Sequence, residues 1–183
     1  MASSDPLKEF ETLLAGSDYL FVLYYRGHWC PFCTAHIREL IPLAPAFASA
    51  NATPVIITAE DAKQLPTTRA ATGYTGAAIV DPAHIIATEL RRRGWVDVAI
   101  QSCIRYYPHN RAEPAVLVVK RDGTVLESWA IAPALSNLYG GTSRPRLEQI
   151  WKNALAKEKG EARPHKKYNT TTVMVFLRQK LFG

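Results

Sequence analysis

The chain has 183 residues, 48% of them hydrophobic and 21% charged, a composition typical of a folded domain rather than a disordered chain. Its formal charge of +6 is a modest excess, and no run of about 18 uncharged apolar residues predicts a membrane span, so we expect neither nucleic acid nor membrane as a partner. The three cysteines, Cys30, Cys33 and Cys103, are too few for a secreted disulfide framework, and residues 1–14 do not resemble a signal peptide. We therefore expect a reducing, cytoplasmic setting.

The first half of the chain alternates predicted helices and strands. A short helix is expected over residues 5–15, where Asp5 can cap the first turn. The continuous apolar run over residues 19–25 predicts a buried strand. Another helix should begin near Cys30 or Pro31, and two prolines further along should kink or shorten it. The elements that follow are a strand at 53–58, a helix at 60–72, a strand at 77–80 and a helix at 83–93.

The second half begins with residues 94–112, which show no clear period. Two β-rich runs, 115–119 and 124–129, then flank an Asp-Gly pair at 122–123, which predicts a hairpin. An amphipathic helix is expected over residues 143–158. Strands and helices that alternate and are closed by a hairpin and a helix predict an α/β fold with a central mixed sheet flanked by helices.

A different composition begins after this domain, which spans residues 1–159. Residues 160–167, GEARPHKK, form a polar, basic linker, and residues 170–177 are β-prone and largely apolar. An exposed strand of this kind would be prone to aggregation. We therefore expect the tail, residues 160–183, to dock on its own domain or on a partner chain.

The main chemical signal is the C-x-x-C motif Cys30-Pro31-Phe32-Cys33 between a strand and a helix. A cysteine at a helix N-terminus faces unpaired N–H groups and the positive end of the helix dipole, both of which favour the thiolate. Arg26 and His28 can add positive potential, and Pro31 suits the first helical turn. We expect Cys30 to be the more exposed, activated nucleophile and Cys33, one turn later, to be the more buried resolving cysteine.

Two other interpretations of the motif stay open. The cysteines could be ordinary core residues, or they could be half of a zinc site. A structural zinc site needs four ligands, and the sequence holds no second C-x-x-C. We therefore expect neither a metal nor a cofactor.

Residues 23–40, LYYRGHWCPFCTAHIREL, resemble the active-site segment of thioredoxin-fold proteins, and the form RGxWCPFC is typical of peroxiredoxin-like proteins of the alkyl hydroperoxide reductase/thiol-specific antioxidant family. Residues 78–82, AIVDP, are similar to the strand and Asp-Pro element that peroxiredoxins add to the thioredoxin core. Residues 113–123 resemble the thioredoxin-fold segment that carries a cis proline. The resemblance covers about residues 5–156. It implies a thioredoxin-like fold with a peroxiredoxin-type strand–helix insertion, and a cis Pro114 that lies against the dithiol.

The sequence also departs from the peroxiredoxin pattern. Typical members have a Thr or Ser three residues before the peroxidatic cysteine and an Arg on a later strand, whereas these positions fall at Gly27 and near Pro114 here. This favours a thiol–disulfide oxidoreductase in which Cys30 attacks and Cys33 resolves. The alternatives are a peroxidase with Cys30 as peroxidatic and Cys33 as resolving cysteine, a pathway-specific enzyme acting on a small molecule, and a binding module that keeps only the fold.

Several neighbours of the motif are candidates for supporting roles. Trp29 forms either the rim of a substrate groove or ordinary packing, and His28 is either an acid/base group or an idle histidine in an exposed turn. We expect His36 at the surface, Glu113 facing solvent, and Cys103 as a lone buried cysteine, with a resolving thiol as the alternative. The supporting residues are Arg26, Gly27, His28, Trp29, Pro31, Phe32 and Pro114.

The expected partners follow from the redox interpretation. The substrate would be a thiol or a disulfide, and the reductant glutathione or a thioredoxin-type protein. A homodimer held by the tail is expected, with docking of the tail on its own domain as the alternative.

Overall fold

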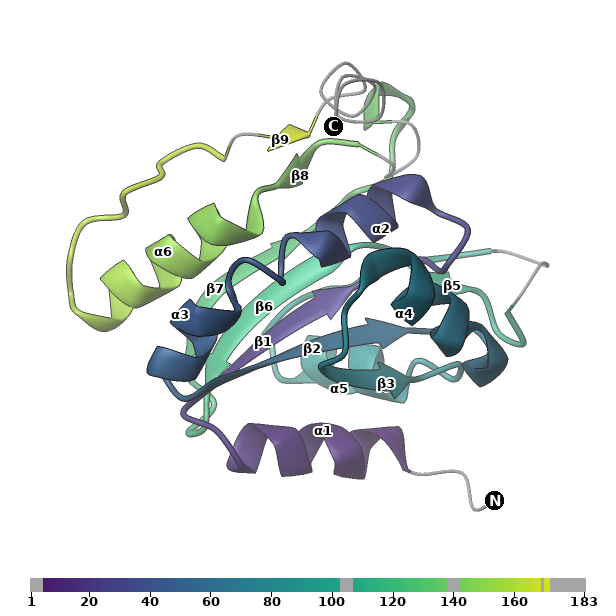
Figure 1. Ribbon diagram of the computed structural model, residues 1–183, viewed down its shortest axis with the longest axis horizontal. Coiled ribbons are helices and arrows are strands. Elements are labelled where there is room, and N and C mark those ends of the chain that lie inside the picture. The colour runs from purple at the N-terminus through teal and green to yellow at the C-terminus, as the bar shows by residue number, and fades with distance from the viewer. Residues whose placement is uncertain (1–4, 103–106, 138–141, 169, 172–183) are drawn as a thin grey trace.

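The computed structural model describes residues 5–102, 107–137, 142–168 and 170–171. A five-stranded sheet in the order β3-β2-β1-β6-β7 forms its centre (Figure 1). Its strands are β1 (Tyr19–Tyr24), β2 (Ala52–Thr58), β3 (Ala77–Val80), β6 (Ala115–Lys120) and β7 (Val125–Ala130). The strands β1, β2 and β3 run parallel, whereas β6 is antiparallel to both β1 and β7. The predicted α/β fold with a mixed sheet is confirmed.

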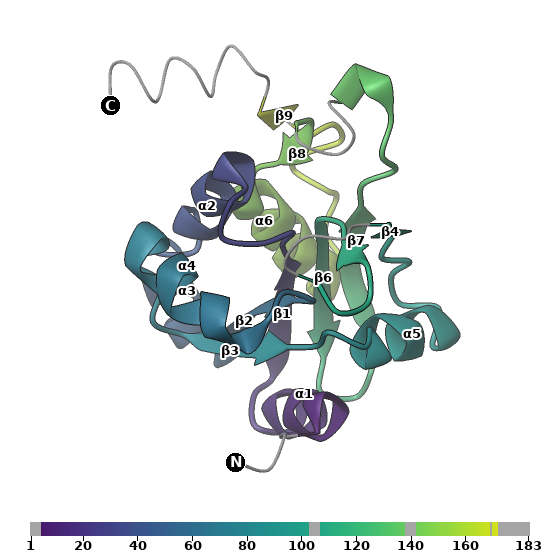
Figure 2. The same cartoon turned by 90° about the vertical axis from the view of Figure 1, so that its right-hand side faces the viewer.

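Both faces of the sheet are covered, which explains the unbroken apolar run of β1. Successive side chains of a strand point to opposite faces. Val22 accordingly packs in a cluster with α1 (Pro6–Ala15) and α5 (Ile85–Arg92), while Phe21 and Leu23 pack in a second cluster with the remaining helices. Figure 2 shows α1 and α5 on one side of the sheet and α2, α4 and α6 on the other.

The helices of the second face are α2 (Pro31–Arg38), α3 (Ala44–Ser49), α4 (Leu65–Thr72) and α6 (Leu147–Glu158). Prolines set the break between α2 and α3, as expected: Pro42 lies in the turn, and Pro45 lies in the first turn of α3. A short 3₁₀ turn, η1 (Ala62–Gln64), precedes α4. A second 3₁₀ turn, η2 (Leu135–Asn137), follows β7.

The predicted hairpin is confirmed. It joins β6 to β7, and the Lys120 N–H donates to Thr124 O at 2.9 Å. Gly123 has a φ of +87°, a left-handed conformation that glycine adopts without steric cost. Residues 94–112, whose sequence shows no clear hydrophobic period, contain a small antiparallel pair of strands, β4 (Ile100–Gln101) with β5 (Arg111–Ala112). Cys103 lies outside the described residues.

The last helix differs from the expectation, because it begins at Leu147 rather than at residue 143. Pro145 restricts the residue before it to extended conformations, and Arg146 is extended as well, with ψ at 131°. Arg144 and Pro145 instead form β8, which pairs with β9 (Thr170–Thr171). Residues 170–171 of the tail therefore dock on their own chain, and residues 172–183 lie outside the described residues.

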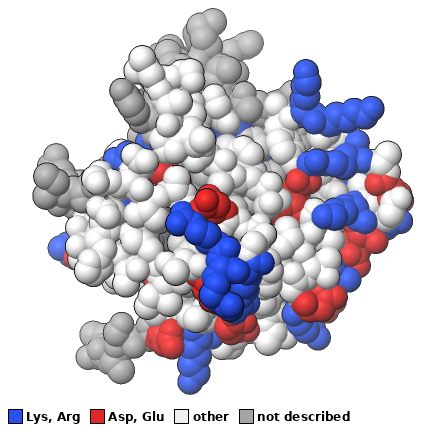
Figure 3. All heavy atoms as spheres, turned by 180° about the vertical axis from the view of Figure 1, so that it is seen from behind, with Lys and Arg blue, Asp and Glu red and all other residues white. Residues whose placement is uncertain are grey.

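The surface over α5 carries both basic and acidic side chains. Figure 3 shows this face from behind, with basic side chains next to acidic ones. In the last turn of α5, Arg92 pairs with Glu89 at 2.6 Å, and Arg93 pairs with Glu89 and Glu11. None of the helices in the described ranges has the length and apolar character that crossing a membrane requires.

Candidate active site

The dithiol lies where β1 feeds into α2. Cys30 is the N-cap residue of α2, Pro31 opens the helix, and Cys33 lies in its first turn. Both cysteines are free thiols, and both are buried, with 1% of Cys30 and 0% of Cys33 exposed. Cys30 is the more exposed of the two, as expected, but only by this small margin. Both residues belong to the apolar cluster beneath α6, and Phe32 packs against the same cluster.

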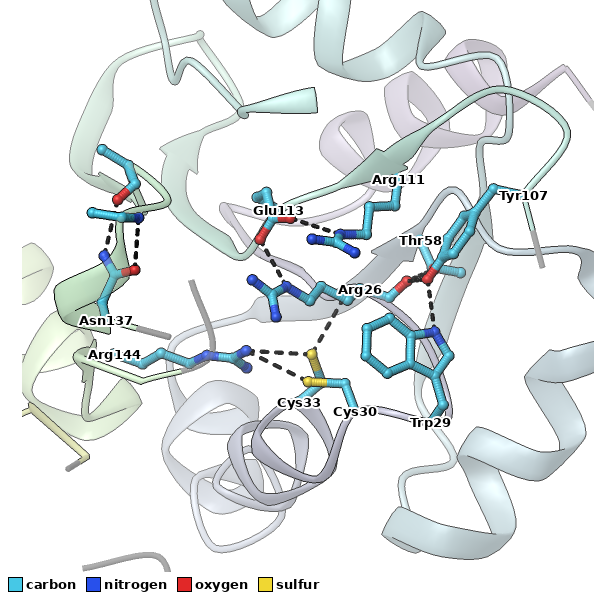
Figure 4. Close-up of polar contacts among 12 residues, drawn as sticks. Arg26, Trp29, Cys30, Cys33, Thr58, Tyr107, Arg111, Glu113, Asn137 and Arg144 are labelled. Atoms are coloured by element: carbon cyan, nitrogen blue, oxygen red, sulfur yellow. Dashed lines mark hydrogen bonds and ion pairs between the residues drawn. The ribbon is translucent and has the colours of Figure 1, made fainter. Parts of the chain in front are cut away.

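Arg144 reaches the dithiol from β8. Its Nη2 atom lies 3.5 Å from Cys33 Sγ and 3.8 Å from Cys30 Sγ, as Figure 4 shows. Arg144 is itself only 2% exposed. A buried guanidinium next to a thiol favours the thiolate, because water screens the attraction only weakly there. The sequence does not point to this residue, since Arg144 falls inside the helix predicted over residues 143–158; the neighbouring Pro145 is the available signal against that helix.

The thiolate is better stabilised on Cys33 than on Cys30. The backbone N–H of Arg26 donates to Cys33 Sγ at 3.3 Å. Burial by itself opposes ionisation of Cys33, but hydrogen bonding with the Cys30 thiol, the Arg144 charge and the Arg26 amide together lower the pKa of Cys33 to about 5. The hydrogen bond with Cys33 raises the pKa of Cys30, and burial adds to that rise. The geometry around the sulfurs therefore favours the thiolate on Cys33, whereas position at the helix N-terminus predicted it on Cys30.

The Arg26 side chain is paired with Glu113, whereas its backbone N–H contacts Cys33 Sγ. Arg26 Nε lies 2.7 Å from Glu113 Oε2, and Arg111 Nε lies 2.8 Å from Glu113 Oε1. Glu113 is 0% exposed, so the expectation that it faces solvent is wrong. A buried carboxylate without partners would oppose a nearby thiolate. The two arginines therefore compensate a charge that would otherwise work against the dithiol.

Pro114 follows a trans peptide bond, since no cis peptide bond occurs among the described residues. The expectation of a cis Pro114 is therefore wrong. The Glu113 N–H donates to Ala99 O at 2.9 Å, and Pro114 O accepts from the Ile131 N–H at 3.1 Å. These bonds hold the chain extended from β5 into β6, which suits the trans form that X–Pro bonds prefer by roughly 0.5–1 kcal/mol.

Trp29 lies at the rim of the site and is also tied into it. Trp29 directly precedes Cys30 in the chain, and the residue is 37% exposed. Trp29 Nε1 donates to the Tyr107 hydroxyl at 3.0 Å, and that hydroxyl donates to the carbonyl oxygen of Arg26 (Figure 4). The Arg111 guanidinium lies 6.0 Å from the Trp29 ring centroid. Trp29 thus packs against Tyr107 and Arg111, as one of its two predicted roles requires. Its other predicted role, at the rim of a substrate groove, stays a prediction.

The structure pairs His28 with a buried carboxylate. His28 Nδ1 lies 2.6 Å from Glu60 Oε1, and the His28 N–H donates to Glu60 Oε2 at 2.8 Å. Gly27 leaves room for this contact, because a Cβ atom there would lie 2.6 Å from Glu60 Oε1 and 2.8 Å from the Tyr107 hydroxyl. A side chain at position 27 would therefore displace the Glu60 carboxylate or the Tyr107 hydroxyl from these contacts.

His36 is buried, so the expectation of a surface position is wrong. Its Nε2–H donates to Pro145 O at 2.9 Å, and burial together with the Arg144 charge lowers the pKa of His36 to about 3. Glu39 Oε2 accepts from the Leu147 N–H at 2.9 Å. The helix that carries the dithiol thus also holds the segment that carries Arg144.

Metal binding finds no support in the described parts of the chain, where no three His, Cys, Asp or Glu side chains converge.

A model of the AhpC/TSA family matches residues 7–128. The chain belongs to this family. Among solved structures, it is similar to peroxidoxin BcpB from Mycobacterium tuberculosis, with 14% identity, a TM-score of 0.58 and coverage of 82% of this chain and 84% of that one. No curated protein matches the sequence well enough to count as a relative.

Two further solved structures share the fold. A cysteine-to-serine mutant of peroxiredoxin 6 from Arenicola marina has 15% identity and a TM-score of 0.63, covering 87% of this chain and 71% of that one. The bacterioferritin comigratory protein of Xanthomonas campestris has 16% identity and a TM-score of 0.54, covering 82% and 83%. The expected thioredoxin-like fold of peroxiredoxin type is confirmed, and with the family the expectation of an oxidoreductase is confirmed.

Proposed function

We propose that this AhpC/TSA family member is a thiol peroxidase that reduces a hydroperoxide with Cys30 and Cys33. The observation that carries the proposal is the Arg144 guanidinium within 3.5 and 3.8 Å of the two sulfurs. The sequence offered neither a hydroxyl at position 27 nor an arginine near Pro114 to bind a peroxide, and this favoured disulfide exchange. With Arg144 in place that argument weakens, because a guanidinium can hold a thiolate and also donate to a peroxide oxygen.

The proposed reaction begins at Cys33, where the thiolate is favoured. Cys33 Sγ attacks one peroxide oxygen, the O–O bond breaks, and the product is a sulfenic acid on Cys33 and an alkoxide, which takes the proton of the Cys30 thiol. The Cys30 thiolate then attacks Cys33 Sγ, forming the disulfide and releasing hydroxide, which takes a proton from solvent. In sum, two thiols and one hydroperoxide give one disulfide, one alcohol and one water.

Burial of the dithiol favours a small substrate. With 1% of Cys30 and 0% of Cys33 exposed, both sulfurs need a local opening before they can react. A hydroperoxide requires a smaller opening than a protein disulfide. The similar bacterioferritin comigratory protein of Xanthomonas campestris has alkyl peroxide reduction activity, which agrees with this choice of substrate.

Thiol–disulfide exchange is the second candidate. The two-residue spacing favours it, since the cysteines share one helical turn and one guanidinium and can form a disulfide without large movement. In either function an external thiol must reduce the Cys30–Cys33 disulfide, giving two protein thiols and one external disulfide. Glutathione or a thioredoxin-type protein in the cytoplasm is the proposed reductant, and the proposed assembly is a homodimer.

A parallel assay separates the two candidates. Hydroperoxide consumption and disulfide reduction are measured with the same protein and the same thiol reductant, for wild type, Cys30→Ser, Cys33→Ser and Arg144→Gln. We expect hydroperoxide consumption to dominate and to be lost in Cys33→Ser. Fast disulfide reduction without hydroperoxide consumption would make exchange the function instead.

A further inference from the structure

The strand that carries Arg144 has its own strand partner near the end of the chain. Arg144 pairs with Thr171 and Pro145 pairs with Thr170, in an antiparallel two-stranded sheet separate from the central one. Figure 1 shows this β8–β9 pair above α2, away from the five main strands. We propose that the C-terminal strap, residues 161–168 together with 170–171, is a positioning element that holds Arg144 against the dithiol. Its importance for turnover rests on the proposed function of the dithiol.

Asn153 of α6 gives the strap its first fixed point. It is completely buried. Its Nδ2 atom donates to His165 O at 2.9 Å, and its Oδ1 atom accepts from the His165 N–H at 3.0 Å. One side chain thus makes both hydrogen bonds to the backbone of a single residue, as a neighbouring strand would. A strap held in this way has a defined path toward β8.

The second fixed point combines an ion pair with an aromatic ring. Arg163 Nη2 lies 2.8 Å from both carboxylate oxygens of Glu127 on β7, and it donates to the Tyr168 hydroxyl at 3.0 Å. Tyr168 packs against the same apolar cluster that contains Cys30 and Cys33. The strap is therefore attached to β7, to α6 and to the core of the site before it reaches β9.

On its other side, the Arg144 segment is held by α2. His36 donates to Pro145 O, and Glu39 accepts from the Leu147 N–H. Both bonds lie beyond Arg144 in the chain, whereas the pairing with Thr171 is at Arg144 itself. The strap therefore acts on the one residue whose guanidinium touches the sulfurs. Removing the strap should let Arg144 move while α2 and the central sheet stay folded.

The test compares two truncations in the absence of hydroperoxide. The first ends at Tyr168 and loses β9, and the matched control ends at Thr171 and keeps it. Ultraviolet thiolate absorbance across pH and the alkylation rate at about pH 6 report ionisation of the dithiol, and circular dichroism reports folding. We expect the shorter protein to lose about tenfold in alkylation rate, which at about pH 6 corresponds to a rise of about two pKa units, and the control to stay within about twofold.

The same truncations in an Arg144→Gln background decide whether the strap acts through Arg144. We expect no further change there, because the cation is already gone. A loss of equal size in that background, or no loss in the wild-type background, overturns the proposal. These measurements do not involve turnover, so they test the role of the strap independently of whether the protein is a peroxidase.

A second pair of variants uses the full chain in case the shorter protein does not fold. Thr171→Pro removes the backbone N–H opposite Arg144, and Thr171→Ala keeps it. We expect only the proline variant to lower the alkylation rate, by up to about tenfold. Equal rates in the two variants would show that pairing at Thr171 does not position Arg144.

Discussion

Arg144 Nη2 lies 3.5 Å from Cys33 Sγ, although 111 positions separate the two residues in the chain. Arg144→Gln should raise the pKa of the Cys33 thiol and lower its alkylation rate at about pH 6 by about tenfold or more, because the buried cation is lost. Arg144→Lys should retain part of the effect. Arg146→Gln, a change at an exposed arginine two positions away, is the control. Equal rates for Arg144→Gln and the control would contradict the role of Arg144.

The order of the two cysteines can be read by trapping the sulfenic acid. We expect Cys30→Ser treated with a small hydroperoxide to accumulate sulfenic acid on Cys33, because no resolving thiol remains. Cys33→Ser should give about tenfold less label on Cys30, because burial raises the pKa of that thiol even without the Cys33 partner. Mass spectrometry after labelling with a dimedone probe measures both. Strong labelling of Cys30 in Cys33→Ser would restore the order that the sequence suggested.

The lowered pKa of Cys33 makes stability depend on pH. A group whose pKa is lower in the folded protein than in the unfolded chain adds stability above its unfolded pKa, and this stability is lost as pH falls through the folded value. For Cys33 that window runs from its ordinary value of 9.0 down to about 5. Reduced wild type should therefore lose stability relative to Cys33→Ser between about pH 9 and pH 5, as measured by urea unfolding. His36, with a lowered pKa, acts in the same direction below its ordinary value of 6.5 but is common to both proteins, so its contribution cancels. Because Cys33→Ser also removes the hydrogen bond that raises the pKa of Cys30, the difference in stability reports the coupled Cys30–Cys33 pair.

The Glu113 ion pairs should be a large stability determinant. Glu113→Gln leaves the buried Arg26 without its carboxylate, and we expect a loss of about 3–5 kcal/mol in unfolding free energy. The control is Glu148→Gln, which removes an exposed pair with Lys152 and should cost less than about 1 kcal/mol. Chemical denaturation of both variants measures the difference. Equally small losses of unfolding free energy in the two variants would show that the attraction within the buried Glu113 pairs is offset by the cost of desolvating their charges.

The homodimer is tested by light scattering of the reduced protein. The apolar run at residues 173–177 predicts an association surface, because such a strand exposed alone would aggregate. We expect the mass of a dimer at micromolar concentration and that of a monomer after deletion of residues 168–183. A full-length monomer contradicts the dimer, and a dimer that survives the deletion shows that the tail is not its cause.

Local patterns in the sequence were enough for most of the fold. The apolar run over residues 19–25 predicted a strand covered on both faces, and the Asp-Gly pair before Thr124 predicted a turn between strands; both are present. The placement of the C-x-x-C motif at the start of α2 followed from the same patterns. These features depend on neighbours within a few positions, and the sequence shows those neighbours directly.

Only the tertiary structure decided the chemistry around the dithiol. Helix position suggested that Cys30 holds the thiolate, but the Arg26 amide and the Arg144 guanidinium favour Cys33. Glu113 was expected in solvent, yet the fold buries it against Arg26. In each case the deciding partner comes from a distant part of the chain or from backbone geometry. Electrostatic energies depend on separation and burial in space, and neither quantity can be read from spacing along the chain.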